Sequence, residues 1–157
     1  MPEDLMAELK ALGQHLPDGE RRANSSLQCQ ALQTAELYRL AALLYLYAVS
    51  PFLTDGLEKD HHFRAALDLL KQMAICTSPW PLFLIGCEAS TDEHRVCILD
   101  MLDRMDKFRA IGNVLVARRL LETYWKHLDL VGTRIHVDDR PRVWDFLRAE
   151  KAAPWFI

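Results

Sequence analysis

The stretch SPWPLFLIGCEASTDEHR (residues 78–95) holds the residue types of a nucleophilic site: Cys87, the acidic Glu88 beside it, and His94 a short way on. A nucleophilic cysteine needs its thiol pKa lowered by a histidine, a cation or a helix N-terminus. The sequence places Cys87 instead near the C-terminus of an expected helix, where the helix dipole disfavours a thiolate. We therefore interpret Cys87 as a buried structural cysteine, and Gly86 before it as a point of close packing.

Donor side chains for a metal ion occur in the same part of the chain: His61, His62, Cys76, Cys87, Glu88 and His94. Neighbouring side chains on a helix diverge by about 100°, however, so the two adjacent histidines would not converge on one ion. The sequence contains neither an H-E-x-x-H motif nor a C-x-x-C pair. A polar helix start explains the histidines better, and we expect neither a metal nor another cofactor.

Three carboxylates, Asp100, Asp103 and Asp106, recur every three residues and would share one helix face. A di-metal or prenyl-diphosphate site needs a D-D-x-x-D type of cluster that faces an apolar cavity. Here the aspartates are interleaved with Arg104 and Lys107, so we interpret them as a solvated face. The four tryptophans of the chain could line an apolar pocket. Such a pocket would combine His61, Cys87, Glu88 and Trp125.

Composition excludes several function classes. The chain has 157 residues, of which 50% are hydrophobic and 26% charged, which is typical of one globular domain. Its formal net charge is −3 and its basic residues come only in pairs, which argues against direct nucleic-acid contact. The longest apolar run, residues 40–49, is too short to span a bilayer, and the acidic N-terminus does not resemble a signal peptide.

Apolar periodicity predicts helices nearly throughout, and we expect an all-α, irregular bundle of about six to seven helices. We expect one domain over residues 1–157, with an N-terminal helix and loop (1–26) and a helical core (27–157). Ser78 is expected to cap a short helix with Pro79 or Pro81 in its first turn, and Ser90 with Glu93 fits a capping box for the next helix.

The helix expected from residue 27 to residue 50 carries one strongly apolar face. Its side chains recur at three- and four-residue steps: Leu37, Leu40, Leu44 and Tyr47. We expect this face to serve both as core and as a contact surface for a protein partner or a second copy of the chain.

Two stretches, AELYRLAALLYLYAV (residues 35–49) and WPLFLIGCEASTDEHR (residues 80–95), carry a family resemblance. They resemble the C-terminal regulatory domain of fungal zinc-cluster transcription factors, the group called fungal-specific transcription factor domain 2. The resemblance covers most of residues 35–157. The matching signature comprises Trp80, Pro81, Leu82, Phe83, Gly86, Cys87, Glu88, Ala89 and Arg95.

The resemblance implies a non-enzymatic regulatory or protein-interaction module of a transcription regulator. The six-cysteine zinc cluster of such factors is absent from the sequence, so no DNA-binding motif is expected in this chain. The resemblance also implies a protein partner or homo-oligomer, and it allows a small-molecule effector. It implies a nuclear location, whereas the residues alone suggest a nuclear or cytoplasmic one. The alternative is a small fungal enzyme or small-molecule-binding protein that uses the aromatic pocket. No contact with a membrane is expected.

Overall fold

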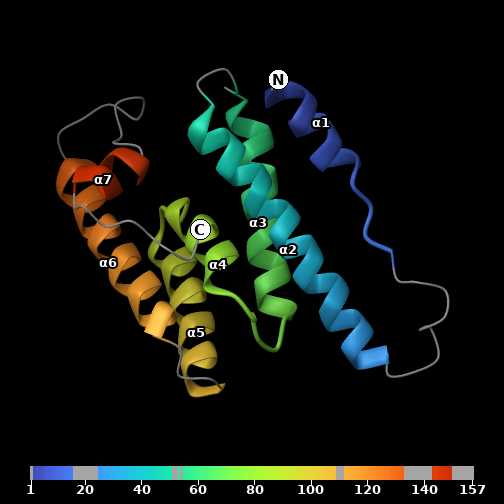
Figure 1. Ribbon diagram of the computed structural model, residues 1–157. Coiled ribbons are helices and arrows are strands. Elements are labelled where there is room, and N and C mark those ends of the chain that lie inside the picture. Colours follow the sequence, from blue (N-terminus) through green and yellow to red (C-terminus); the bar gives the residue numbers. More distant parts are fainter. Residues whose placement is uncertain are drawn as a thin grey trace. The chain divides into compact units, whose positions relative to one another are not determined.

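The computed structural model describes residues 2–15, 25–50, 53, 55–108, 112–132 and 143–149. Over these ranges the regular secondary structure is helical, without a strand, so the all-α prediction is confirmed (Figure 1). None of the described helices combines the length and the apolar character that a membrane-spanning segment needs. The helices are α1 (Pro2–Ala11), α2 (Ser25–Val49), α3 (Gly56–Gln72), α4 (Pro79–Cys87), α5 (Asp92–Phe108), α6 (Gly112–Gly132) and α7 (Val143–Ala149).

The chain divides into two compact units, Met1–Thr77 and Ser78–Ile157. We call them unit 1, which contains α1 to α3, and unit 2, which contains α4 to α7. The expected single domain over residues 1–157 stays a prediction. The apolar C-terminal residues PWFI, which the sequence predicts to dock on the core, lie outside the described residues.

Unit 1 is organised around α2, and both α1 and α3 pack against it (Figure 1). The helix α3 starts at the N-cap Asp55, whose side chain accepts hydrogen bonds from the backbone N–H groups of Leu57 and Glu58, both at 3.1 Å. Such a cap satisfies N–H groups that have no partner within the helix. A small core cluster joins α1 to α2 and consists of Met6, Leu43, Leu46 and Tyr47, with Leu9 and Leu53 packed against it.

The apolar face predicted on α2 is part of the core. The exposed fractions are 0% for Leu37, 3% for Leu40, 1% for Leu44 and 9% for Tyr47. The four side chains therefore belong to the core, as expected. The expectation that the same face also contacts a partner or a second copy stays a prediction. A face this apolar is stabilised by removal from water, which packing within the chain already achieves.

Unit 2 is built on α4, α5 and α6, which all contact one another. Along α4 only Trp80 is left partly exposed, so the helix is covered on nearly every side. The short α7 packs on α6 through Phe146, whose ring centroid lies 5.4 Å from those of Tyr124 and His127. The buried α4 therefore places the signature stretch at the centre of unit 2.

Candidate functional site

The start of α4 follows the sequence prediction. Ser78 is the N-cap, with its Oγ accepting from the backbone N–H of Trp80 at 3.4 Å, and Pro79 fills the first turn. The next helix starts differently from the prediction. Thr91, not Ser90, caps α5, because its Oγ1 accepts from the backbone N–H of His94 at 3.3 Å. The N-cap of α5 therefore lies one residue later than the capping box at Ser90 predicted.

Gly86 lies where α4 packs against α6. A Cβ atom built on this residue would lie 2.8 Å and 2.9 Å from the two Cδ atoms of Leu121, and 3.3 Å from Cγ2 of Ile98. Leu121 and Ile98 are themselves fully buried. Since real Cβ atoms essentially never lie within 3.0 Å of such neighbours, glycine is what allows the two helices to come this close. The predicted role of Gly86 in close packing agrees with this geometry.

Trp125 of α6 binds the end of α4 at the same point. Its indole Nε1–H donates a buried hydrogen bond to the backbone carbonyl of Gly86 at 2.9 Å. The same carbonyl accepts from the backbone N–H of Ala89 at 3.1 Å. A buried indole N–H needs an acceptor, and the last carbonyls of a helix need donors, so one contact satisfies both requirements.

Arg95, the last residue of the signature, completes this arrangement. Its guanidinium carbon lies 5.5 Å from the centroid of the Trp125 ring. Two hydrogen bonds of 2.8 Å and 2.7 Å join its Nη1 and Nη2 to the carboxylate of Asp129. A planar guanidinium suits both contacts, because it stacks on an aromatic face while it donates to both oxygens of a carboxylate. We call Gly86, Arg95, Leu121, Trp125 and Asp129 the α4–α6 junction.

The ion pair of the junction shifts the pKa values of both its members. The hydrogen bonds to Asp129 raise the pKa of Arg95 above its ordinary value, and those from Arg95 lower the pKa of the Asp129 carboxyl. A second set of ion pairs lies farther along the same two helices, where Arg118 of α6 contacts both Asp103 of α5 and Glu122. Arg95 and Arg118 therefore each connect α5 with α6 through a carboxylate.

Cys87 does not have the surroundings of a nucleophile. It is 9% exposed and is the last residue of α4, next to the C-cap Glu88. At this end the helix dipole raises the free energy of a thiolate. The structural interpretation of Cys87 accords with this position.

The residues of the alternative pocket are divided between the two units, and the pocket stays a prediction. Cys87, Glu88 and Trp125 lie in unit 2, whereas His61 is an exposed residue of α3 in unit 1. The indole N–H of Trp125, which a ligand could have used, already donates to Gly86. Among the described residues, no group of three or more histidine, cysteine or acidic side chains could hold a metal ion.

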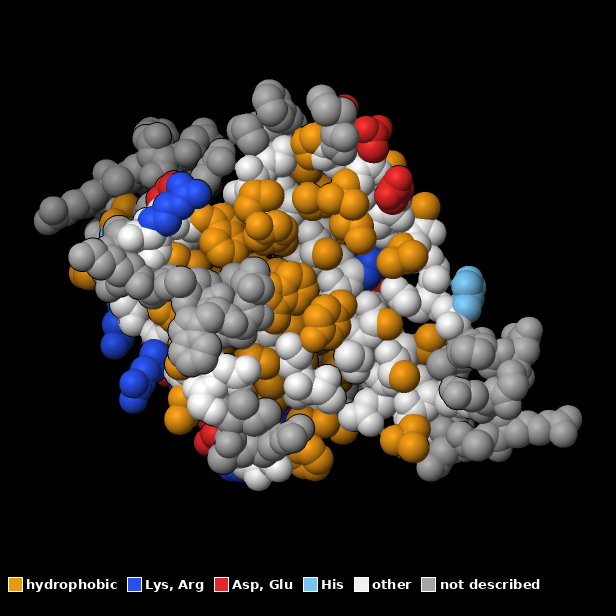
Figure 2. Space-filling model, viewed as in Figure 1, with side chains coloured by type: hydrophobic (Ala, Val, Ile, Leu, Met, Phe, Trp, Pro, Cys, Tyr) orange, Lys and Arg blue, Asp and Glu red, His pale blue; other side chains and the backbone are white. Residues whose placement is uncertain are grey.

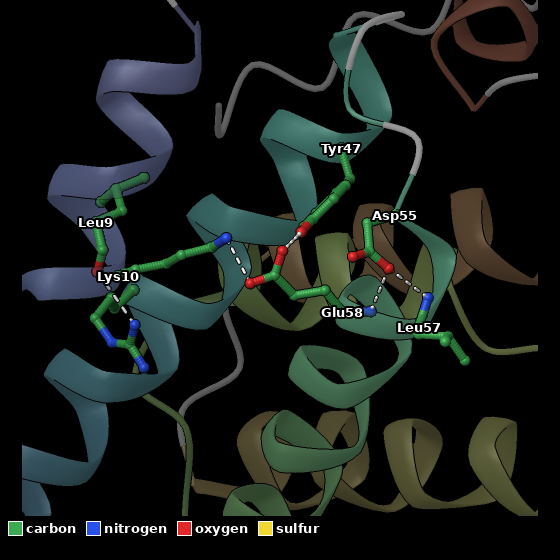
Figure 3. A network of polar contacts seen from close by, with 7 residues as sticks. Leu9, Lys10, Tyr47, Asp55, Leu57 and Glu58 are labelled. Atoms are coloured by element: carbon green, nitrogen blue, oxygen red, sulfur yellow. Dashed lines mark hydrogen bonds and ion pairs between the residues drawn. The ribbon is translucent and has the colours of Figure 1, made fainter.

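A different polar network lies in unit 1, where α1 meets α2 and α3 (Figure 3). Lys10 of α1 forms an ion pair of 2.5 Å with Glu58 of α3, which accepts a hydrogen bond of 2.8 Å from the Tyr47 hydroxyl of α2. The hydrogen bonds from Lys10 and Tyr47 lower the pKa of Glu58. Burial, together with the bond to Glu58, raises the pKa of Tyr47. One carboxylate therefore connects the three helices of unit 1.

Arg39 adds a second polar contact between α1 and α2. Its Nη1 donates to the backbone carbonyl of Leu9 at 3.1 Å, and its Nε and Nη2 donate to the two carboxylate oxygens of Glu36 at 2.8 Å and 2.5 Å. The Leu9 carbonyl belongs to the last turn of α1, where no N–H of the helix can reach it. Arg39 thus caps the C-terminal end of α1 with a side chain that Glu36 holds in place.

His62 of α3 lies next to Tyr47. It is 9% exposed, and its Nε2 has no hydrogen-bond partner among the described residues. Burial lowers the pKa of His62, against a smaller opposing effect of Glu58. Its ring centroid lies 6.3 Å from that of Tyr47.

Sequence reasoning missed several residues that build these sites. It did not connect Leu121 with Gly86 or Asp129 with Arg95, although both Leu121 and Asp129 lie four residues from Trp125 and therefore on the same face of α6. Glu58, Arg39 and Lys10 were missed as well. The i, i+3 spacing of Glu36 and Arg39 was visible, but nothing in the sequence connects either residue with α1.

Comparisons with known proteins agree with the resemblance noted in the sequence. A family model described as "Fungal specific transcription factor domain" matches residues 3–148. The chain is 32% identical over 96 residues to "Transcription factor iacI" of Pestalotiopsis fici (strain W106-1 / CGMCC3.15140). That match covers 60% of this chain and 25% of the relative, so the chain corresponds to about a quarter of the relative's length. No solved structure matches the chain significantly.

Proposed function

Because the chain belongs to the fungal-specific transcription factor domain family, we propose that it is a non-enzymatic regulatory module that binds other proteins and does not itself contact DNA. Its place of action in this proposal is the nucleus, where transcription is regulated. Binding of a small-molecule effector stays a prediction.

The pairing of arginine side chains is the observation that carries the proposal. A nucleic-acid surface directs guanidinium groups toward phosphates and base edges. In the part of the chain that the structure describes, six arginines have a carboxylate oxygen within 4 Å instead: Arg39, Arg64, Arg95, Arg104, Arg118 and Arg148. Neutralised in this way, they offer little positive potential to a phosphate backbone.

Apolar surface supports the protein-binding half of the proposal. Figure 2 shows hydrophobic side chains predominating over charged ones on the viewed face. On α5 and α6, Val96 is 64% exposed and Leu130 is 74% exposed. Because these residues directly follow Arg95 and Asp129, which are bonded to each other, the two apolar side chains lie at the same end of the helix pair. A protein partner would remove such side chains from water.

A reporter assay tests the proposal. The chain is fused to an unrelated DNA-binding domain, and expression of a reporter gene with the matching site is measured. We expect the fusion to change expression, and we expect the double variant Val96→Glu/Leu130→Glu to lose most of that effect. Leu57→Glu is the matched control, since Leu57 is 87% exposed and lies in unit 1.

The DNA half of the proposal has its own measurement. The unfused chain is titrated into fluorescent duplex DNA at low salt, where non-specific electrostatic binding is strongest. We expect no rise in anisotropy at micromolar protein. Binding that weakens as salt is added would show that the chain contacts DNA and would overturn this half.

A further inference from the structure

The helix α1 is held in unit 1 by few contacts, each of a different kind. Met6 is 4% exposed and is the buried side chain of this helix. Lys10 pairs with Glu58, and both of these side chains remain 35% exposed. The backbone carbonyl of Leu9 accepts from Arg39 (Figure 3). A helix of ten residues is marginal in water on its own, so α1 depends on these contacts for its structure.

The surface that receives α1 has charged groups that also bond to residues of α2 and α3. It consists of the apolar side chains Leu43, Leu46 and Tyr47, the carboxylate of Glu58 and the guanidinium of Arg39, and we call it the α1 site. Its charged groups are positioned from within α2 and α3. The Tyr47 hydroxyl holds Glu58, and Glu36 holds Arg39. A site whose polar groups are already oriented can exchange one occupant for another without rebuilding itself.

Most side chains of α1 remain exposed, so the helix buries little of its own surface in the α1 site. In the α1 site, α1 places one buried side chain, the partly buried Leu9 with its carbonyl on Arg39, and one ion pair that solvent screens. Elements with few buried apolar contacts open more often than the elements that they cover. When α1 detaches, the buried side chains Leu43, Leu46 and Tyr47 become accessible.

We propose that the α1 site is a receptor for an amphipathic helix of a partner protein, and that α1 occupies it when the partner is absent. The site defines the chemistry of that helix. It carries a bulky apolar side chain, a lysine or arginine four residues later as in Met6 and Lys10, and a C-terminal end close by, so that its free carbonyl meets Arg39. This inference deepens the proposed function and rests on it for the existence of a partner.

A peptide with the sequence of residues 2–15 serves as the probe, because it carries every α1 group that the site contacts. The receiving protein is the full chain with Met6→Glu and Lys10→Glu. In this variant the tethered α1 would bury a charge and would repel Glu58, so it leaves the site. Measured by fluorescence anisotropy, the labelled peptide should bind this variant at least 10-fold more tightly than the wild-type chain, whose own α1 competes for the site.

A charge exchange tests the specificity of the α1 site. For this test the receiving chain carries Met6→Glu and Lys10→Ala, so that its own α1 cannot pair with a lysine at position 58. Adding Glu58→Lys should then weaken binding of the wild-type peptide about 10-fold, and a peptide with Lys10→Glu should restore it. A peptide with Glu8→Lys is the matched control, because Glu8 is exposed on α1. Equal binding to wild type and double variant, or indifference to the Glu58→Lys change, would overturn the proposal.

Folding and self-association are checked on the same samples. If the double variant loses its helical circular dichroism, Lys10→Glu alone replaces it with the same expectations. Light scattering that finds a dimer in place of peptide binding would identify a second copy as the occupant and would overturn the partner-helix proposal.

The two proposals fail separately. Peptide binding together with an inactive reporter fusion refutes the proposed function alone. An active reporter with a site that ignores the peptide refutes the α1 site alone.

Discussion

The two units join their helices by different means. At the α4–α6 junction of unit 2, a glycine lets the helices approach until Gly86 lies against Leu121, and a buried indole hydrogen bond fixes their register. In unit 1, α1 is attached by one buried methionine and by the ion pair of Lys10 with Glu58, of which both side chains are a third exposed. The difference teaches that the signature stretch is held by close, buried packing, whereas α1 is attached through contacts that solvent partly reaches.

The distribution of tryptophan allows the two units to be followed separately. All four tryptophans of the chain belong to Ser78–Ile157. Tryptophan fluorescence therefore reports on unit 2, while hydrogen exchange of α2 and α3 reports on unit 1. Each of the following predictions tests whether the contrast between a rigid junction and a loosely attached helix holds.

The largest effect is expected from Gly86→Val. The new side chain would overlap the Cδ atoms of Leu121 in a core that has no room to move, and we expect a loss of about 3 kcal/mol in the free energy of unfolding of unit 2. Denaturant titration followed by tryptophan fluorescence measures this loss. Leu121→Ala combined with Gly86→Val should be less destabilising than the sum of the two single changes.

Gly112→Ala is the control for this prediction. Gly112 is the first residue of α6, and a Cβ atom built there would meet nothing within 4 Å. We expect its effect to stay within about 0.5 kcal/mol. If Gly86→Val proved equally harmless, the junction would be as adaptable as the α1 attachment, and the contrast would disappear.

Trp125→Phe should have the second-largest effect. Phenylalanine keeps most of the buried apolar area but removes the N–H that donates to the Gly86 carbonyl. We expect a loss of about 1–2 kcal/mol in the free energy of unfolding of unit 2, because a buried acceptor loses one of its two donors. The three remaining tryptophans report the unfolding transition. An unchanged transition midpoint would contradict a structural role for this hydrogen bond.

Arg95→Lys should have a smaller effect, of about 1 kcal/mol. Lysine cannot donate to both oxygens of Asp129 while it stacks on Trp125. A double-mutant cycle with Asp129→Asn isolates the coupling energy of the pair. Arg64→Lys is the control, since this side chain is 74% exposed and pairs with Asp60 within α3, and we expect it to be neutral.

Much of this fold was predictable because helix signals are local. The cap Ser78 and the apolar period of α2 depend on neighbours a few residues away, which the sequence displays directly. The residue that Gly86 packs against, Leu121, lies on another helix and is not displayed in this way. The face at Leu37 and Leu40 was predictable as core, because an apolar stripe predicts burial, but such a stripe does not predict which element buries it.

The sites were harder to predict than the helices because they combine residues that are distant in the sequence. The hydrogen bond from Trp125 to Gly86 joins residues 39 positions apart, and the bond from Arg39 to Leu9 joins residues 30 positions apart. The pattern of charges offered several partners for Glu58 and Lys10. The packing of α1 on α2 brings Lys10 to Glu58, and the sequence does not display this packing.

The smallest predicted effect concerns pH and is confined to unit 1. His62 is buried, and its pKa is lowered below the ordinary value of 6.5. The unfolded chain therefore takes up a proton at a higher pH than the folded chain does. The contribution of His62 to the stability of unit 1 is complete above pH 6.5 and is lost as the pH falls from there toward the pKa of the folded state. The charged groups that act on His62 are Glu58, His61, Lys10 and Arg39.

Hydrogen exchange of α2 and α3 at pH 7.5 and pH 5.5, corrected for intrinsic rates, measures this effect. We expect weaker protection at the lower pH, and His62→Gln should abolish the difference, whereas His61→Gln, at an exposed position, should preserve it. Asp129 should not lower the stability of unit 2 over this range, because its pKa is depressed below 3.8 and its contribution is lost only in stronger acid. Equal weakening of both units would show that the acid response belongs to the whole chain and not to the loosely attached region.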